Sequence, residues 1–81
     1  MNSSNAPMFR VGRRARSGEW RPATKHRLYD DAEIVARGLV LGGEASETRI
    51  WLISRGQPTI VARVTPVKKF GADLEAVVST V

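Results

Sequence analysis

The sequence contains no cysteine, which excludes disulfide bonds and thiolate metal sites and agrees with a reducing compartment such as the cytoplasm. It contains a single histidine, His26, and so lacks the usual ligands of a metal centre. No apolar run approaches the roughly 20 residues that span a bilayer, and residues 1–9 lack the apolar core of a signal peptide. We therefore expect a cytoplasmic protein with no metal, no cofactor and no membrane segment.

Catalytic residue types are also scarce in this chain. His26 is the only candidate base for a nucleophile, and it lies in a basic stretch where a solvated role is favoured. Asp30, Asp31 and Glu33 are close together, but acidic residues gather in the first turn of a helix because they offset its dipole. The sequence therefore predicts a binding protein and no enzyme.

Positive charge is concentrated at one end of the sequence. The 81 residues carry a net charge of +5, and residues 1–27 hold seven basic residues and one acidic residue. Residues 28–81 hold six basic and seven acidic residues, so the whole surplus lies in the first third. Such asymmetry indicates an anionic partner, most often nucleic acid. The alternative is a solubilising arm with no partner.

The first third of the sequence predicts a tail followed by a β-hairpin. Residues 1–7 are polar and without periodicity, and we expect a disordered tail there, leaving residues 8–81 as one domain. Alternating apolar residues predict a strand over 8–13, and Ser17-Gly18 predicts a turn. A short return strand over 19–21 would end at Pro22, which has no amide proton.

A helix is predicted over about 31–41. Asp30 is interpreted as its N-cap, with Glu33 completing a capping box and Tyr29 and Ile34 forming a hydrophobic staple. The apolar residues at helical spacing predict an inward stripe made of Leu28, Ala32, Val35 and Leu39. Gly42-Gly43 predicts the end of the helix, and Gly38 is interpreted as a close packing point.

The second half predicts two more strands and an ambiguous end. The β-branched runs 49–55 and 59–65, separated by Gly56-Gln57-Pro58, predict a hairpin that Pro66 would end. Residues 70–81, which include Phe70, fit either a strand or a helix that covers the second sheet face, and the helix is slightly favoured. The expected fold is therefore α+β, with a small antiparallel sheet of two hairpins, about four strands, packed against one helix.

Two candidate binding surfaces follow from these patterns. Arginine forks grip phosphate and an aromatic ring among them can stack on a base, so we expect nucleic acid to contact Arg10, Arg13, Arg14, Arg16, Trp20, Arg21, Lys25 and Arg27. The alternative is a protein interface for a host protein or a second copy of the chain. Its candidates share the second sheet face and are Trp51, Ile53 and Val61.

Two resemblances accompany these predictions. The stretch FRVGRRARSGEWRP…HRLYDDAEIVARGL, from Phe9 to Leu41, resembles the arm-type DNA-binding domains of phage integrases, in which a basic sheet lies in the major groove. That resemblance implies DNA contacts by Arg10, Arg13, Arg21 and Arg27. The hairpin–helix–hairpin order over residues 8–66, with TRIWLISRGQPTIVARV after the helix, is similar to short uncharacterised proteins of actinobacteria and their phages. The second likeness implies a fold but no activity.

Overall fold

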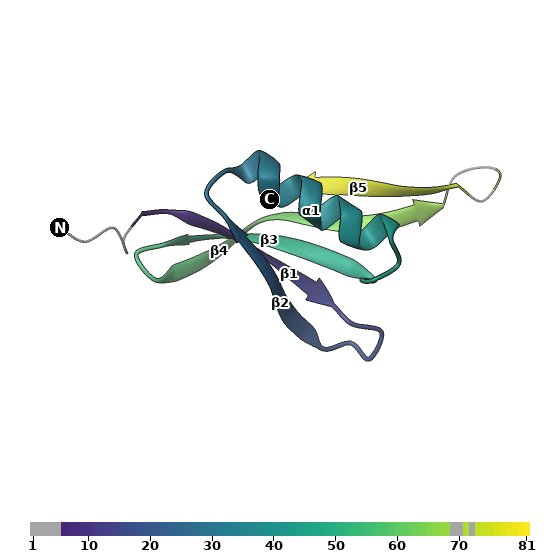
Figure 1. Cartoon of the computed structure of the whole chain (residues 1–81), viewed down its shortest axis with the longest axis horizontal. Helices are drawn as coiled ribbons and strands as arrows, with labels where there is room; N and C mark the ends of the chain where they lie inside the picture. The colour runs from purple at the N-terminus through teal and green to yellow at the C-terminus, as the bar shows by residue number, and fades with distance from the viewer. Residues whose placement is uncertain (1–5, 69–70, 72) are drawn as a thin grey trace.

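The predicted combination of an antiparallel sheet and one helix is confirmed by the computed structural model, which describes residues 6–68, 71 and 73–81 (Figure 1). Five strands and one helix are present in this part of the chain. In chain order they are β1 (Met8–Arg14), β2 (Trp20–His26), α1 (Tyr29–Leu41), β3 (Glu47–Ser54), β4 (Gln57–Lys68) and β5 (Leu74–Thr80). The thirteen-residue helix is too short to cross a membrane.

The strands form a single sheet in the order β2-β1-β3-β4-β5, and every neighbouring pair is antiparallel. The two predicted hairpins are thus joined side by side through β1 and β3. Val11 of β1 pairs with Ile50 of β3, and both side chains are fully buried. The centre of the sheet is therefore built from segments that are far apart in the sequence.

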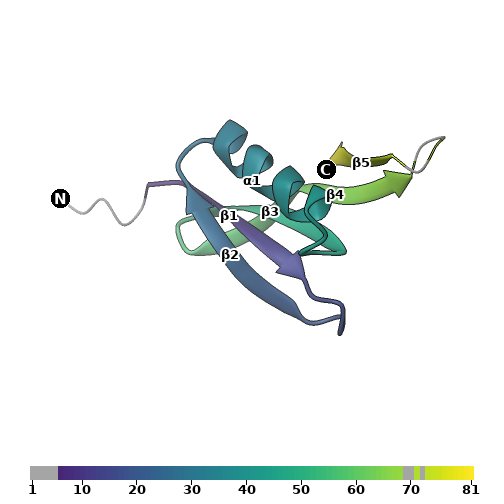
Figure 2. The ribbon, with the colours of Figure 1, turned by 45° about the vertical axis from the view of Figure 1, so that its right-hand side comes forward.

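The helix lies across one face of this sheet (Figure 2). Ala32, Ala36 and Val40, spaced by four residues, are buried against an apolar patch of the sheet made of Val11, Ile50, Ala62 and Val64. Alanine side chains allow the helix backbone to approach closely. The helix and β3 are close enough here for a direct hydrogen bond. The buried hydroxyl of Thr48 donates to the carbonyl oxygen of Ala36 at 3.1 Å.

The start of the helix differs from the prediction. The N-cap position is Leu28, whose side chain makes no capping hydrogen bond, and Asp30 and Asp31 lie in the first turn. The predicted capping box is therefore wrong, and so is the staple, because Ile34 is 69% exposed. Tyr29 instead packs edge-on against Phe9, with ring centroids 5.7 Å apart. This tertiary contact explains why the helix begins before the residue that local chemistry favours.

The end of the helix was predicted correctly. Gly43 has a φ of 75°, the left-handed conformation that favours glycine, and the Glu44 amide donates a hydrogen bond to the Leu39 carbonyl at 3.0 Å. Gly38, however, is exposed, and a Cβ placed on it would meet no atom within 4 Å. Its interpretation as a close packing point is wrong. Leu28, predicted to face inward, is 62% exposed because it precedes the first helical turn.

Two prolines predicted to end strands do not do so. β2 continues through Pro22, since this strand forms an edge of the sheet and Ala23 bulges out of the ladder next to the proline. β4 continues through Pro66, where β3 has already ended and only β5 is a neighbour. In both places the missing amide proton lies in a strand with one paired side, where it is tolerated.

Residues 74–80 form a strand, so the favoured prediction of a final helix is wrong. β5 pairs with the outer half of β4, from Lys68↔Leu74 to Ala62↔Thr80, and extends the sheet at its edge. Phe70 and residues 1–5 of the expected tail lie outside the described residues. Because β5 extends the sheet, no described element covers the face opposite α1 (Figure 2). We call this surface the open face.

Candidate nucleic-acid interface

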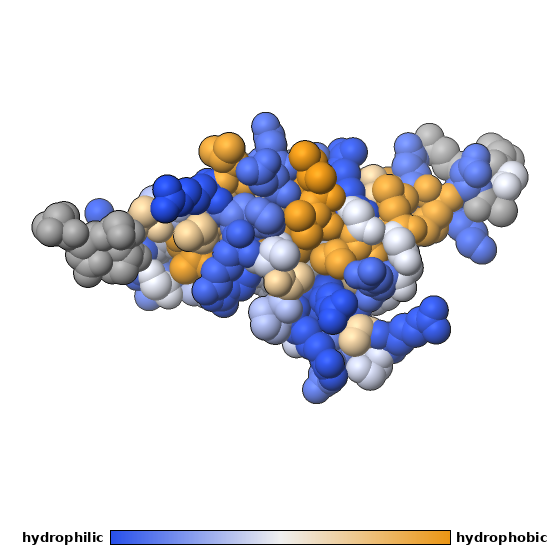
Figure 3. Space-filling view, in the orientation of Figure 1, coloured by the Kyte–Doolittle hydropathy of each residue, from blue (hydrophilic) through white to orange (hydrophobic). Residues whose placement is uncertain are grey.

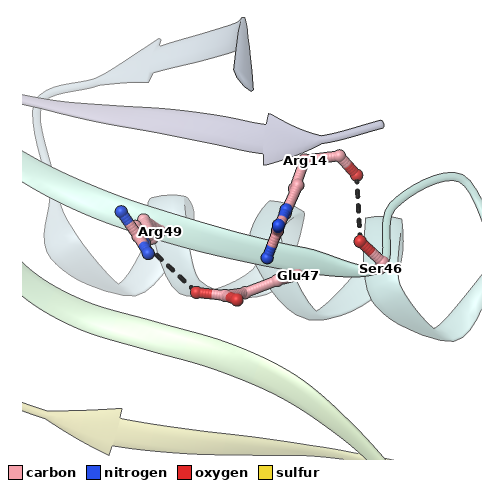
Figure 4. Close-up of polar contacts among 4 residues, drawn as sticks. All are labelled: Arg14, Ser46, Glu47 and Arg49. Carbon is pink, nitrogen blue, oxygen red and sulfur yellow. Dashed lines mark hydrogen bonds and ion pairs between the residues drawn. The ribbon is translucent and has the colours of Figure 1, made fainter. Parts of the chain in front are cut away.

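Side-chain alternation divides β1 and β3 between the two faces of the sheet. Val11 and Ile50 point to the helix, so their neighbours point to the open face. Four cross-strand pairs occupy that face, namely Met8↔Ile53, Arg10↔Trp51, Gly12↔Arg49 and Arg14↔Glu47. Figure 4 shows Arg14, Glu47 and Arg49 in front of the two strands, with the helix behind them. The open face thus combines arginines with an aromatic ring.

Two tryptophans form the centre of the open face. The rings of Trp20 and Trp51 meet edge to face, with centroids 6.0 Å apart and planes at 84°. The outer edge of the six-membered ring of Trp51 contacts Gly12, where an added Cβ would fall 2.5 Å from Cζ3 and 3.0 Å from Cη2. Gly12 is therefore required so that the indole can lie against the backbone of β1.

Arg49 fixes the position of Trp20. Its guanidinium carbon lies 4.2 Å from the centroid of the Trp20 ring, a cation–π contact. Its Nε donates to Oε2 of Glu47 at 3.1 Å (Figure 4), which holds the guanidinium over the ring. Arg49 therefore occupies one face of Trp20, whereas no cation–π contact is found on Trp51 among the described residues.

A shallow groove of about 340 Å³ runs beside these rings. We call it the aromatic groove. Its apolar lining is Trp20, Pro22, Trp51, Ile53 and Pro58, together with Gly12, and Arg10 and Arg21 are the charged residues at its border. Among residues 6–68, 71 and 73–81, no carboxylate, amide or hydroxyl side chain lines it. The aromatic groove therefore suits a flat, uncharged ring system attached to an anionic group.

A second groove adjoins the aromatic groove and carries most of the positive charge. This basic groove, of about 440 Å³, is lined by the four cationic residues Arg10, Lys25, Arg27 and Arg55, with Met8, Ile53 and residues 6, 7 and 56. A third hollow, of about 540 Å³, is lined by residues 22–25 and also by Arg10. Arg10 thus borders all three depressions, which makes them one continuous surface.

Three pairs of basic residues face each other across neighbouring strands in the described part of the chain: Arg10↔Lys25, Arg13↔Arg21 and Arg49↔Arg63. Directly opposed like charges destabilise a sheet. In two of these pairs one member has an acidic partner, because Arg21 binds Glu19 at 3.0 Å and Arg49 binds Glu47.

The pair Arg10↔Lys25 has no such neutralisation. Both residues are exposed, and neither forms an ion pair with any described residue. The pair also lies where the aromatic and basic grooves meet. It is therefore the point of the open face at which an anion would relieve the most repulsion.

The predicted nucleic-acid residues are only partly brought together. Arg10, Trp20, Arg21, Lys25 and Arg27 line the grooves, and Arg14 shares their face. Arg13 alternates to the helix side with Val11, and Arg16 lies in the turn between β1 and β2. Neither contributes to the grooves. Residues that are close together in the sequence point alternately to the two faces of a pleated strand, so the basic residues of this segment are separated.

The residues predicted for a protein interface fall on the same open face, with one exception. Trp51 and Ile53 line the aromatic groove. Val61 is a bulge residue with no partner on β3, since Ile50 pairs with Ala62 and Trp51 with Ile60, and its side chain packs against the helix-side core. The bulge places Ile60 opposite Trp51, so the placement of Val61 on the open face is wrong.

Sequence reasoning missed four contributors to the site, namely Gly12, Arg49, Arg55 and Pro58. Arg55 and Gly56 form a two-residue turn between β3 and β4, with φ of 53° and 75°, rather than the predicted turn at 56–58. Arg55 reaches the basic groove because this turn lies beside the start of β1. The alternation of β3 already placed Arg49 and Trp51 on one face, which was the available signal.

Comparisons of the chain with protein-family models, curated proteins and solved structures found no match. The described residues contain no group of three His, Cys, Asp or Glu side chains that could hold a metal ion.

Proposed function

We propose that the protein is a non-enzymatic nucleic-acid-binding protein and that it binds through its open face. The observation that carries the proposal is the un-neutralised pair Arg10↔Lys25 at the junction of two grooves. A phosphate between these side chains would accept hydrogen bonds from the guanidinium and the ammonium group. It would also remove a repulsion that the folded protein otherwise retains.

The charge around the grooves sets the expected strength and salt dependence of binding. Arg10, Lys25, Arg27 and Arg55 can each contact a phosphate, and the described lining of the two grooves contains no acidic residue. Four phosphate contacts to a single strand correspond to a slope of about −3 in log K against log salt. Phosphate contacts of this kind give affinity and orientation but carry no direct sequence information.

The test is fluorescence anisotropy of labelled DNA and RNA oligonucleotides at low salt, with one charge removed at a time. We expect Arg10→Gln to weaken binding about tenfold, because it removes a charge-assisted contact at the junction of the grooves. Arg37→Gln is the matched control, since Arg37 is exposed on the helix, on the other side of the sheet. Equal losses from the two variants would reduce the proposal to non-specific attraction by net charge. No binding by the wild type would refute it.

Self-association is the second candidate function, and the contrast between the two sheet edges favours it. The β2 edge is protected by Pro22, a bulge and Lys25. β5 has no proline, no bulge and a single charged residue, Glu75. Exposed apolar surface accompanies β4 and β5, and Figure 3 shows part of it at the right. The large exposed apolar residues of these two strands and the residue after β5 are Val67, Leu74, Val77 and Val81.

A second copy of the chain is the partner that fits this edge. Two β5 strands can pair antiparallel about a two-fold axis, and the low charge of β5 lets two basic molecules approach there. Sedimentation equilibrium would then report a dimer that Val77→Lys dissociates. Ile34→Lys, which places the same charge on another exposed apolar residue, should leave the dimer intact. A wild-type monomer at all concentrations would refute this candidate.

A further inference from the structure

We infer that the open face selects single-stranded over double-stranded nucleic acid, with an unpaired base in the aromatic groove and its phosphate between Arg10 and Lys25. This inference rests on the proposed nucleic-acid function and specifies its ligand. The two grooves have different chemistry, one apolar and one cationic, and they share Arg10. A nucleotide has the same two parts, a flat base and an anionic phosphate.

The aromatic groove is the part that distinguishes a single strand from a duplex. Its walls are two indole rings, two prolines and an isoleucine. Stacking on such rings tolerates any base, because every base has a π-face. In a duplex the bases are stacked on each other and the exterior presents phosphates and sugars, so the aromatic groove would stay uncovered.

The sheet register places the two subsites at nucleotide distance. Arg10 pairs with Trp51 on one side and with Lys25 on the other, so aromatic and cationic side chains follow one another over three adjacent strands. Neighbouring strands are about 4.8 Å apart. A base stacked on Trp51 therefore carries its phosphate toward Arg10 and Lys25.

Trp20 and Trp51 have different parts in this site. Trp20 is held by Arg49 at 4.2 Å, and Arg49 is held in turn by Glu47. Trp20 meets Trp51 edge to face, and the outer edge of the six-membered ring of Trp51 contacts Gly12. Trp51 is the stacking platform, and the other four residues fix its position before the ligand binds.

The aromatic groove offers no side-chain acceptor to the sugar among its described residues. In the part of the chain that the structure describes, no carboxylate, amide or hydroxyl side chain lines it that could accept a hydrogen bond from a ribose 2′-hydroxyl. We therefore expect DNA and RNA single strands of the same length to bind with affinities within about threefold of each other.

Four ligands of equal length separate these claims: oligo(dT), oligo(U), an abasic deoxyribose-phosphate chain and a DNA duplex. Binding is measured by anisotropy and by quenching of tryptophan fluorescence at one low salt concentration. We expect oligo(dT) and oligo(U) to bind about tenfold or more tightly than the abasic chain, since stacking contributes substantially for each base. We also expect the duplex to bind more weakly than either and to cause little quenching.

Substitutions then assign the two subsites. Trp51→Leu should weaken oligo(dT) about tenfold and leave the abasic chain within twofold, because it removes stacking but no charge. Trp51→Phe should restore most of the affinity, since the ring is kept. Arg10→Gln should weaken both ligands in similar proportion. Circular dichroism of each variant verifies the fold, and Trp51→Phe keeps the test valid if Trp51→Leu fails to fold.

The failure of this inference and the failure of the proposed function give different results. If the duplex binds as tightly as oligo(dT) and Arg10→Gln weakens both, the preference for single strands is wrong and nucleic-acid binding stands. If the abasic chain equals oligo(dT), the aromatic groove does not hold a base. If none of the four ligands binds, both proposals are wrong.

Discussion

The six-membered ring of Trp51 lies so close to the backbone of Gly12 that a Cβ on Gly12 would be 2.5 Å from Cζ3 and 3.0 Å from Cη2 of the indole. The φ of Gly12 is not positive, so the backbone alone would accept a side chain there. The glycine is thus needed for the ring and not for the conformation of β1. This contact joins the packing of the sheet to the site on its open face.

Gly12→Ala should therefore lower the free energy of unfolding by about 1–3 kcal/mol, the usual cost of overpacking. Urea denaturation measures the loss. In a Trp51→Leu background the same substitution should cost close to nothing, because the clashing ring is gone, and this double-mutant cycle isolates the contact. An equal cost in both backgrounds would mean that the alanine clashes with something other than Trp51.

Lys25→Gln should stabilise the free protein while it weakens binding. Removing one of two directly opposed positive charges at Arg10↔Lys25 relieves a repulsion of about 0.2–1 kcal/mol. The gain, measured as the melting temperature at low ionic strength, should shrink as salt is added, because salt screens exposed charges. Arg37→Gln should instead lose stability slightly, since it breaks the pair with Glu33 at 3.1 Å. A Lys25→Gln protein less stable than the wild type would contradict a repulsive pair.

Gly38→Ala should raise the free energy of unfolding by about 1 kcal/mol. Gly38 is exposed inside α1, and a Cβ there meets no atom within 4 Å. Alanine then removes the entropic cost of a helical glycine without introducing strain. The effect is measured by thermal and urea denaturation, and oligonucleotide affinity should not change because Gly38 lies on α1, away from the open face. A loss of stability would mean that an alanine side chain at position 38 clashes with its surroundings.

Tyr29→Phe should stabilise the protein, and increasingly so at high pH. The Tyr29 hydroxyl is buried and makes no hydrogen bond of ordinary distance and angle with a described residue, and Phe retains the ring that contacts Phe9. Burial raises the pKa of Tyr29 above its ordinary value near 10, and the nearby Glu33 carboxylate raises it further, both as a weak acceptor for the phenol proton and by its negative charge.

The sign of the pH effect follows from that shift. Because the folded state holds the phenol proton more tightly than the unfolded state, the contribution of Tyr29 is present below pH 10. It is lost as the pH rises through the folded pKa. The difference in unfolding free energy between Tyr29→Phe and the wild type should therefore grow above pH 10, whereas other groups titrate alike in both proteins. A constant difference would contradict the raised pKa.

Local chemistry was sufficient to predict some elements of the fold. The two glycines after Leu41 set the end of the helix, and alternation in residues 49–55 correctly placed Ile50 and Trp51 on opposite faces. Features set by tertiary contacts were not predictable in this way. The helix starts at Tyr29 because that ring packs against Phe9, although Asp30 is the better capping residue.

The final strand illustrates how a partner decides between two local preferences. Residues 73–80 combine two early acidic residues, Asp73 and Glu75, which suit a helix, with β-branched residues, which suit a strand. The outer half of β4 has a free edge that accepts backbone hydrogen bonds, and β5 forms there. The length of β4 beyond β3 was not predicted, because Pro66 was taken as its end.

The candidate site was predicted only in part, because the pairing register of the strands brings together residues that are far apart in the sequence. The arginines of residues 10–27 were recognised as a group, but the pleat turns Arg13 away from Arg10. Single-residue bulges at Ala23 and Val61 change which side chains follow on each face. Hydrophobic periodicity does not reveal such bulges. The proximity of Arg10, Trp51 and Arg55 therefore could not be predicted from the sequence alone.

The central place of β1, between β2 and β3, governs how the chain can fold. Closing the sheet requires residues 47–54 to reach residues 8–14 across an entire strand and helix, and non-local pairing of this kind slows folding. During synthesis the first hairpin must wait, with Val11 uncovered, until β3 has left the ribosome. Mutual repulsion among its many arginines would keep waiting chains from aggregating, so the charge that we propose to serve binding would also protect the nascent protein.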